Sequence, residues 1–541
     1  MLTLGGGEPE DLTSNLIGLV AALGLAFAAA APASAQQAAT IEARTAPGGV
    51  LVTWKLAQPT TEVAFLDQDI VRTLWTVKTP GLSLSDGVVK SDQPFDAFDI
   101  LIAPDAAEVD RVYIGLVRVG SGQSLYGPAL ALKDMDAELT VRATAGETVT
   151  PQSNAIQSYV YVGPTSAVTQ DDGGVVVVGE TVPASLRTAM SEGFLAAQGF
   201  YGARLGRDLP YAPTLIVTTD SPGPTTFRGD VTDNGVISLR FHGSDWSAPP
   251  PDVTEQLSTF VWHETLHLWN SHAVTTKDGA SAPWLHEGGA EYGALIAAQS
   301  TGTINEAQLK TSLARRLNGC RAALGDRADA AQRLRTGNAV YNCGVVVQWI
   351  ADLETRRASD GRSDIFDIWK AMLQSGRAGD GYGVADFRNR LTPDTAVAVL
   401  LDGPGPDRWA GVQTRLAALG VTLVNRPSPR DLRQAALFHM VDQNCGGEGG
   451  FSIDNGRIKL DSGDRCGALS GDPVVVAIED LDPMSNGQGV FQAVQARCAE
   501  NLPIRYTLAD GKTVEAVCKA PLQAPDLWAV DAMPDLRARR T

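Results

Sequence analysis

The feature that most constrains this chain is a pair of histidines four residues apart, His263 and His267, within a stretch that holds four of the six histidines. Apolar residues recur at near-helical spacing through this segment, at Val253, Leu257, Phe260, Val261, Leu266 and Leu268. On a helix, the two imidazoles project from one face, one turn apart, as two ligands of a single metal ion must do. The sequence therefore predicts a helix that supplies two metal ligands.

Glu264 follows the first histidine and completes an H-E-x-x-H pattern. In such a helix its carboxylate can reach a water molecule that a zinc ion activates. A surface helix with incidental histidines is the alternative interpretation, but only 6 of 541 residues are histidine, so a chance match is rare. We expect one Zn²⁺ per chain, with Glu264 as the general base.

A catalytic zinc site usually has a third protein ligand. The metzincin solution requires glycine and histidine where this chain has Asn270 and Ala273, whereas a glutamate about twenty residues on is the other common solution. Glu287 satisfies it, and Glu291 lies one turn later. We expect Glu287 to bind the metal and Glu291 to accept a hydrogen bond from the other ring nitrogen of a ligand histidine. Asn270 is expected to contact a ligand histidine in the same indirect way. The reversed assignment of the two glutamates remains open. His286 is expected to be a helix-start residue.

Three segments resemble known peptidases. Residues 263–270, HETLHLWN, resemble the H-E-x-x-H-x-W-N signature of the glycyl aminopeptidase family, and residues 284–288, WLHEG, resemble a segment that this family shares with the aminopeptidase-N group. Both groups are gluzincins. Residues 341–344, YNCG, resemble their Y-x-K-G segment, with Cys343 in place of the lysine. The resemblance implies that Tyr341 stabilises the tetrahedral intermediate; an ordinary aromatic residue at a helix start is the alternative.

One departure from this resemblance concerns the substrate. The resembling families carry a Gly-x-x-Glu-Asn or related motif on an edge strand, and its glutamate holds the free amino terminus of the substrate. Residues 228–234 of this chain read RGDVTDN and contain no glutamate. Asp230 or Asp233 could replace it, but a polar hairpin turn is the favoured interpretation. Aminopeptidase and endopeptidase activity both remain open.

The N-terminal residues 1–35 are predicted to be a secretory signal peptide. An apolar run at 16–30 precedes Ala33-Ser34-Ala35, a small-residue cleavage pattern, although the region before the run is acidic. No other stretch is long and apolar enough to span a bilayer, so we expect no membrane segment in the mature chain. The expected location is periplasmic or secreted.

Charge and cysteine content agree with an exported protein. The net charge of -18 argues against nucleic acid as a partner and leaves a peptide or protein substrate as the expected one. Six cysteines, none in a C-x-x-C pair, predict disulfides. Sequence order suggests the pairs Cys320–Cys343, Cys445–Cys466 and Cys498–Cys518.

The predicted fold class is α+β with several domains. Alternating strand patterns predict a β-sandwich at 36–165 that is antiparallel. Helical periodicity predicts a mainly helical, thermolysin-like zinc peptidase domain at 166–425. A linker near 425–430 leads to short strands and one helix near 489–499, which resemble a small PDZ-like α/β domain at 426–541. Four arginines in the helical region, Arg315, Arg316, Arg356 and Arg357, are expected on solvated helix faces.

These observations favour an exported zinc metallopeptidase in which Glu264 and Tyr341 are catalytic and His263, His267 and Glu287 bind the metal. Two alternatives remain: a catalytically inactive zinc-fold binding protein, and a scaffolding protein built on the β and PDZ-like domains.

Overall fold

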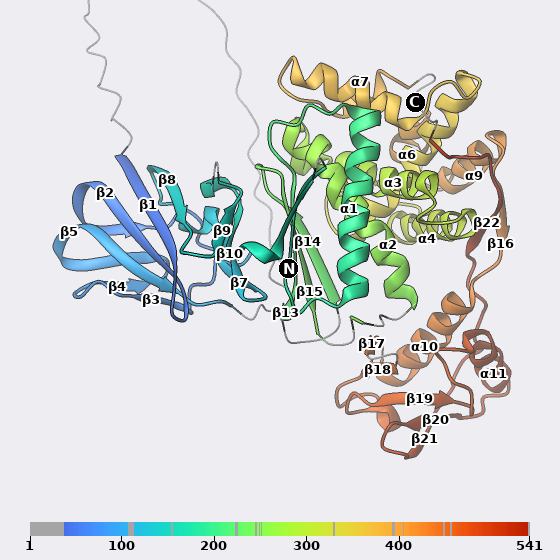
Figure 1. The fold of residues 1–541 in the computed structure, drawn as a ribbon. Coiled ribbons are helices and arrows are strands. Elements are labelled where there is room, and N and C mark those ends of the chain that lie inside the picture. The colour runs from blue at the N-terminus through green and yellow to red at the C-terminus, as the bar shows by residue number, and fades with distance from the viewer. Residues whose placement is uncertain are drawn as a thin grey trace, which may run out of the picture.

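The computed structural model describes most of the chain in three parts (Figure 1). The described residues are 37–105, 113–152, 155–171, 173–221, 226–243, 246–247, 249, 251–327, 330–391, 395–403, 405–446, 449–454 and 457–538. The predicted signal peptide, 1–35, lies outside them. No helix in these ranges is long and apolar enough to cross a membrane.

The N-terminal part consists of two β-sheets. The larger sheet contains β1 (Gln37–Ala46), β2 (Gly49–Ala64), β3 (Trp75–Val77), β4 (Ser83–Ser85), β5 (Val88–Ile102) and β8 (Met135–Arg142). The smaller contains β6 (Leu116–Val119), β7 (Gly122–Tyr126), β9 (Glu147–Thr150) and β10 (Tyr159–Pro164). Residues of both sheets share one apolar core, in which Trp54 stacks on Phe98 at 4.8 Å. The expectation of a purely antiparallel sandwich is wrong, because β1 and β8 pair in parallel.

A central five-stranded sheet joins this part to the helices. Its order is β11 (Val168–Asp171), β12 (Gly174–Val178), β13 (Thr214–Ser221), β15 (Val236–His242) and β14 (Thr226–Val231). Side chains alternate between its faces. Val177 and Ile216 face the N-terminal core, whereas Val176 and Leu215 face the helical core. The sheet therefore contributes side chains to both cores, and β14 is one of its two edge strands.

Helices lie on the other side of the central sheet, where α1 and α2 pack directly against it (Figure 1). They are α1 (Ala184–Leu205), α2 (Pro251–His267), α3 (Pro283–Thr301), α4 (Glu306–Leu324), α5 (Ala330–Arg333), α6 (Asn338–Ala358), α7 (Ile365–Arg377), α8 (Val384–Arg388) and α9 (Arg408–Ala418). Capping boxes at Asn305 and Asp364 start α4 and α7 by satisfying their first backbone N–H groups. The mainly helical character expected from periodicity is confirmed.

The C-terminal α/β part has two helices rather than the one expected. Helices α10 (Pro429–Cys445) and α11 (Gly487–Ala499) pack on an antiparallel sheet of β17 (Gly450–Asp454), β18 (Arg457–Asp461), β19 (Val474–Ile478), β20 (Ile504–Leu508) and β21 (Thr513–Ala516). The predicted linker contains the start of α10, where Ser428 and Asp431 form a capping box and Pro429 occupies the first turn. PDZ-like character stays a prediction.

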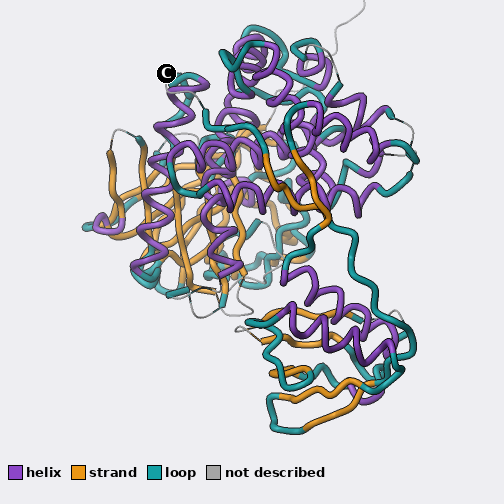
Figure 2. Tube along the Cα trace, turned by 90° about the vertical axis from the view of Figure 1, so that its right-hand side faces the viewer, coloured by secondary structure: helices purple, strands orange, loops and turns teal. Residues whose placement is uncertain are grey.

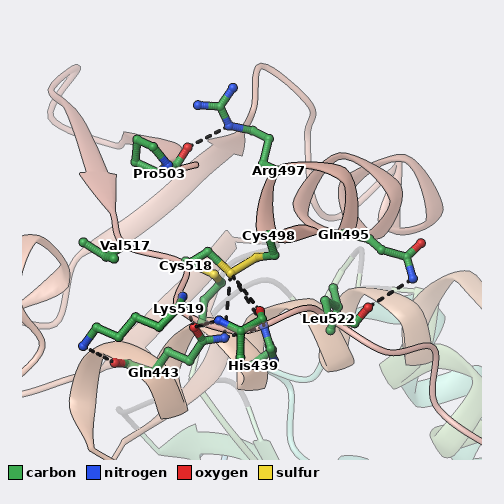
Figure 3. Close-up of a disulfide and its surroundings, with 12 residues drawn as sticks. His439, Gln443, Gln495, Arg497, Cys498, Pro503, Val517, Cys518, Lys519 and Leu522 are labelled. Carbon is green, nitrogen blue, oxygen red and sulfur yellow. Dashed lines mark hydrogen bonds between the residues drawn. A yellow bond between two sulfur atoms is a disulfide. The ribbon is translucent and has the colours of Figure 1, made fainter. Parts of the chain in front are cut away.

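All three predicted disulfides are confirmed. They join Cys320 to Cys343, Cys445 to Cys466 and Cys498 to Cys518. The third lies beside His439, whose Nε2 is 3.7 Å from the sulfur of Cys518 (Figure 3). Because both sulfurs are bonded to each other, this histidine and cysteine group offers no thiolate to a metal.

The chain returns to the helices after the α/β part. Strand β22 (Trp528–Ala532) pairs with β16 (Thr422–Asn425), so two antiparallel segments connect the α/β part to the rest (Figure 2). Residues 533–538 then run along the helices, and we call them the C-terminal strap. The backbone N–H of Ala538 donates to Ser300 Oγ of α3 at 2.7 Å.

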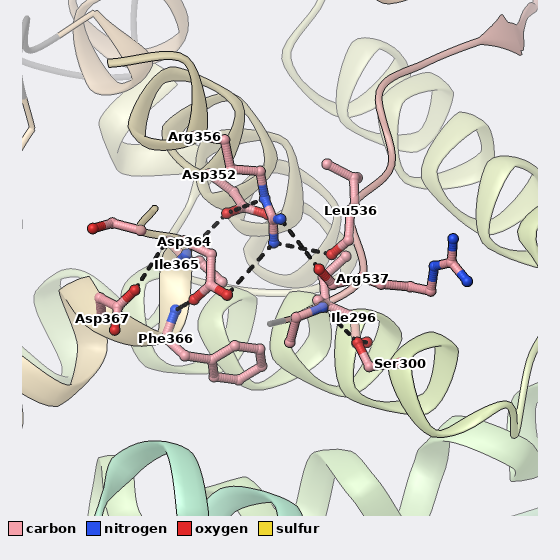
Figure 4. Close-up of polar contacts among 12 residues, drawn as sticks. Ile296, Ser300, Asp352, Arg356, Asp364, Ile365, Phe366, Asp367, Leu536 and Arg537 are labelled. Atoms are coloured by element: carbon pink, nitrogen blue, oxygen red, sulfur yellow. Dashed lines mark hydrogen bonds and ion pairs between the residues drawn. The ribbon is translucent and has the colours of Figure 1, made fainter. Parts of the chain in front are cut away.

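Arg356 on α6 holds the strap in place (Figure 4). Its guanidinium donates to the carbonyl oxygens of Leu536 and Arg537, at 2.9 and 3.3 Å. The same group lies 2.9 Å from Asp352 Oδ1 and 3.7 Å from Asp364 Oδ2, two carboxylates with almost no exposed area. The expected solvated face is therefore wrong for Arg356, which neutralises buried acid.

Replacing Arg356 with glutamine should destabilise the helical part strongly. The change removes one cation from two buried carboxylates and costs about 3 kcal/mol, or roughly 6 to 12 °C in melting temperature. Scanning calorimetry, which separates the transitions of different domains, would measure it. The neighbouring Arg357→Gln variant is the control, because Arg357 is exposed and its one hydrogen bond, to the carbonyl of Ala418, should contribute less than about 1 kcal/mol. Equal effects of the two changes would contradict this account.

Candidate functional site

Helix α2 brings the three residues of the H-E-x-x-H pattern to the inner side of the helical part. His263, Glu264 and His267 are each less than 9% exposed. Directly after His267 the helix widens into a π-helical segment, Leu268–Ala273. Segments of this kind occur often at functional sites because they redirect side chains. Here the segment turns Asn270 back toward His267.

Three atoms converge at the centre of the site. His263 Nε2 and His267 Nε2 are 3.1 Å apart, and Glu287 Oε2 of α3 lies 3.3 Å from each of them. The structure thus brings together two histidines and a glutamate that are separated by up to 24 residues in sequence. The same three residues form a group whose ligand atoms all lie within 4.8 Å of one another.

Asn270 fixes the orientation of His267. Its Oδ1 lies 3.0 Å from His267 Nδ1, while its Nδ2 donates to the carbonyl of His286 at 2.9 Å. Because the amide nitrogen is engaged there, the oxygen faces the ring and His267 Nδ1 is the donor. The Nε2 lone pair of His267 therefore points to the centre of the site.

Glu291 supports His263 in the same way. Its Oε2 lies 3.1 Å from His263 Nδ1, one helical turn beyond Glu287 on α3. An acceptor at Nδ1 places the hydrogen there and leaves the lone pair on Nε2. Glu287 is thus the inner carboxylate and Glu291 the outer one, in the arrangement that the i, i+4 spacing predicts.

His286 has a contact that the sequence did not suggest. Its Nε2 lies 3.5 Å from Glu287 Oε1, the oxygen that faces away from the two central nitrogens. The ring also lies 6.2 Å from that of His267. The expectation of a simple helix-start residue is incomplete, because His286 flanks the carboxylate next to it.

Helices α3 and α6 cross at two glycines, which brings Tyr341 to the site. A Cβ on Gly288 would lie 2.3 Å from Gly344 Cα, and one on Gly344 would lie 2.6 Å from Gly288 Cα. Gly288 follows Glu287, and Gly344 lies one turn after Tyr341. The Tyr341 ring is 6.0 Å from that of His263, so this close crossing places glutamate and tyrosine around one centre.

Strand β14 packs against Glu264. A Cβ on Gly229 would lie 2.9 Å from both Cδ and Oε1 of Glu264, and 2.6 Å from Phe260 Cζ. Only glycine leaves room for the carboxylate beside this strand. The polar segment that contains Gly229 is therefore an edge strand up to Val231, and the expectation of a turn is wrong for that portion.

The two aspartates of residues 228–234, Asp230 and Asp233, pair with side chains outside the group of His263, His267 and Glu287. Asp230 is buried and lies 3.5 Å from Arg240 Nη2. Burial raises its pKa to about 7, although Arg240 opposes the rise. Asp233 Oδ1 lies 2.9 Å from His272 Nδ1, which helps to hold the pKa of Asp233 below its usual value. Both side chains thus have local partners.

A cavity of about 380 Å³ lies beside His263. Glu264 and Tyr341 line it, together with apolar side chains that include Phe227 and Leu295. Arg315 and Arg316 of α4 line it as well. The expectation of a solvated helix face is wrong for Arg316, whose guanidinium pairs with Glu291. Arg315 is half-buried where it borders the cavity.

The charges around the centre influence one another. Burial raises the pKa of Glu264 above its usual value, although His263 and His267 oppose the rise. Burial would also raise the pKa of Glu287, but the two histidines hold it well below its usual range. For Tyr341, burial raises the pKa and the nearby glutamates add to the effect, so its hydroxyl keeps its proton.

The central atoms fit a tetrahedral zinc ion. Ligands at zinc bond lengths of about 2.05 Å in a tetrahedron are separated by about 3.3 Å. The observed separations are 3.1, 3.3 and 3.3 Å. Two imidazole lone pairs and a carboxylate oxygen repel one another at these distances unless a cation lies between them. Two nitrogens and one oxygen are also the donor set of a catalytic zinc site.

Comparison with known proteins supports the fold but not a family assignment. No protein-family model matches the sequence, and no curated protein does. A solved aminopeptidase N family protein from Idiomarina loihiensis is 14% identical, with a TM-score of 0.58, over 92% of this chain and 98% of that one. Legionella pneumophila aminopeptidase A is 11% identical over 70% of this chain and 49% of that one, with a TM-score of 0.39. Yeast LTA4 hydrolase is 9% identical over 76% and 72%, with a TM-score of 0.37. The chain therefore has the multidomain fold of the Idiomarina loihiensis protein.

Proposed function

We propose that this protein is a zinc-dependent peptidase that hydrolyses peptide bonds. The observation that carries the proposal is the convergence of His263 Nε2, His267 Nε2 and Glu287 Oε2 at zinc-ligand separations, with the Glu264 carboxylate close enough to interact with all three residues. The fold shared with an aminopeptidase N family protein supports it. The resemblance to the glycyl aminopeptidase family is part of the proposal.

The chemistry follows from the positions of the side chains. Bound zinc would activate a water molecule and polarise the substrate carbonyl. Glu264 takes the proton of that water on its carboxylate and later delivers it to the leaving amine. Its buried environment raises its pKa, which makes the carboxylate a stronger base for the first of these transfers. Tyr341 keeps its phenolic proton and donates a hydrogen bond to the oxyanion that develops from the carbonyl.

We further propose that substrate binding does not depend on a free amino terminus. The two aspartates of the edge-strand segment, Asp230 and Asp233, are paired with Arg240 and His272. The carboxylates that line the cavity, Glu264 and Glu291, are the proposed general base and the partner of His263 and Arg316, so neither is left to anchor an ammonium group. These features favour internal peptide bonds over terminal ones.

The proposed location is outside the cytoplasm. The signal-peptide pattern at 1–35 is one basis for this proposal. The three disulfides are the other, since such bonds persist in oxidising compartments.

The protein should bind one zinc ion per chain at the proposed site. His267→Ala removes a ligand and should weaken binding by more than about 100-fold, since loss of an outer partner alone costs 10 to 100-fold. Competition with a fluorescent chelator would measure the affinity. His439→Ala is the matched control and should bind zinc like the wild type, because the cysteines near it form a disulfide. Zinc loss in the control alone would place the metal in the C-terminal part.

Glu264→Gln should keep zinc but lose peptidase activity by about 10³-fold or more, because the amide cannot accept the proton of the water. Tyr341→Phe should lower kcat by about 10² to 10³-fold with little change in KM, because only the transition state gains that hydrogen bond. Quenched fluorescent peptides, with and without chelator, would give both constants. Full turnover in Glu264→Gln would rule out the mechanism. Zinc binding without turnover in the wild type would instead favour an inactive binding protein.

Acetylation of the substrate amino terminus should change kcat/KM by less than about threefold. A site that anchors the free amine would instead lose about 10⁴-fold or more, because its buried polar groups would be left unpaired. A peptide library with free and acetylated amino termini, resolved by mass spectrometry, separates the two cases. Release of single residues from free amino termini only would show that the protein is an aminopeptidase.

A further inference from the structure

Arg316 on α4 contacts two residues of the site from outside. Its Nη2 donates to Glu291 Oε1. Its Nη1 donates to Asn342 Oδ1 at 3.1 Å. Glu291 is the carboxylate whose other oxygen faces His263, and Asn342 follows Tyr341 on α6. One guanidinium therefore touches the partner of a proposed zinc ligand and the neighbour of the proposed oxyanion donor.

The position of this guanidinium is fixed by the packing of α4 on α6. The disulfide Cys320–Cys343 joins the two helices with a Cα–Cα distance of 4.7 Å. Cys320 lies one turn after Arg316, and Cys343 follows Asn342. Between them, a Cβ on Gly319 would lie 2.4 Å from Asn342 Nδ2, so the Asn342 side chain packs directly against the backbone of α4 at this point. The disulfide and this contact thus fix the segment of α4 that carries Arg316.

The pair with Glu291 is stronger than an ordinary surface ion pair. The side chains of Arg316 and Glu291 are 28% and 14% exposed, so water screens their charges only in part. Arg316 contacts one oxygen of Glu291 and His263 Nδ1 lies 3.1 Å from the other, so the orientation of this carboxylate is set from α4.

We propose that Arg316 is a positioning residue that couples two parts of the site, the His263 ring through Glu291 and the Tyr341 segment through Asn342. The planar guanidinium can donate to both acceptors at once, and a lysine ammonium group, a single compact charge, cannot reproduce this geometry. The expected effect of Arg316 on turnover rests on the proposed peptidase function. Its effect on zinc affinity can be measured whether or not the protein turns over peptides.

The test compares Arg316→Gln, Arg316→Lys and Asn342→Ala with the wild type. Arg316→Gln should weaken zinc binding about 10 to 100-fold and lower kcat by a similar factor, with KM changed less than about twofold. Arg316→Lys should restore zinc affinity to within about threefold, because it keeps a cation at Glu291, but kcat should stay low. Asn342→Ala should lower kcat and leave zinc affinity within about twofold of the wild type.

Arg335→Gln is the control. Arg335 is an exposed arginine of the same helical part, so this variant makes the same change in net charge away from the site. It should match the wild type in zinc affinity and in kcat. If Arg316→Gln lowers only the melting temperature and keeps the zinc affinity of the wild type, Arg316 is merely structural and the proposal is wrong. Absence of zinc binding in the wild type would overturn the proposed function as well, which is a different outcome from failure at Arg316 alone.

Discussion

The close crossing of α3 and α6 at Gly288 and Gly344 is the constraint on which the rest of the site depends. The backbones approach so closely that either Cβ would overlap a Cα of the other helix. Glu287 and Tyr341 reach one centre only because neither helix carries a side chain at the contact. This explains in physical terms why glycine follows the glutamate in WLHEG and ends YNCG. A second close approach, at Gly229, admits Glu264 beside the edge strand.

The N-terminal sheets contribute to the site by supporting that strand. Ser158 Oγ of the N-terminal part lies 3.1 Å from Thr232 Oγ1, just after β14, and both groups are buried. Side chains on one face of the central sheet belong to the N-terminal core, and those on the other face belong to the helical core. The N-terminal part therefore supports the central sheet and its edge strand β14, and the proposed mechanism uses no group from it.

The sequence predicts those parts of the site that depend on local geometry. Four-residue spacing on a helix puts His263 beside His267 and Glu291 behind Glu287, and sequence order is enough to pair the cysteines. Contacts between distant segments cannot be predicted in this way. Arg316 and Arg356 look like surface cations because their carboxylate partners or carbonyl acceptors lie up to 181 residues away or on another helix. The start of α10 is a different case: Ser428, Pro429 and Asp431 form a recognisable helix start that the composition of the region obscured.

The path of the C-terminal strap has a consequence for the order of folding. Residues 533–538 contact α3 and α6, the helices that carry Glu287 and Tyr341, and β22 completes a ribbon with β16. A chain emerging from a ribosome has made every proposed catalytic residue long before it makes these contacts. Until residues 536 and 537 are available, Arg356 lacks two of its acceptors. The helical part can therefore reach its final packing only after the α/β part, which comes before the strap in sequence, has been synthesised.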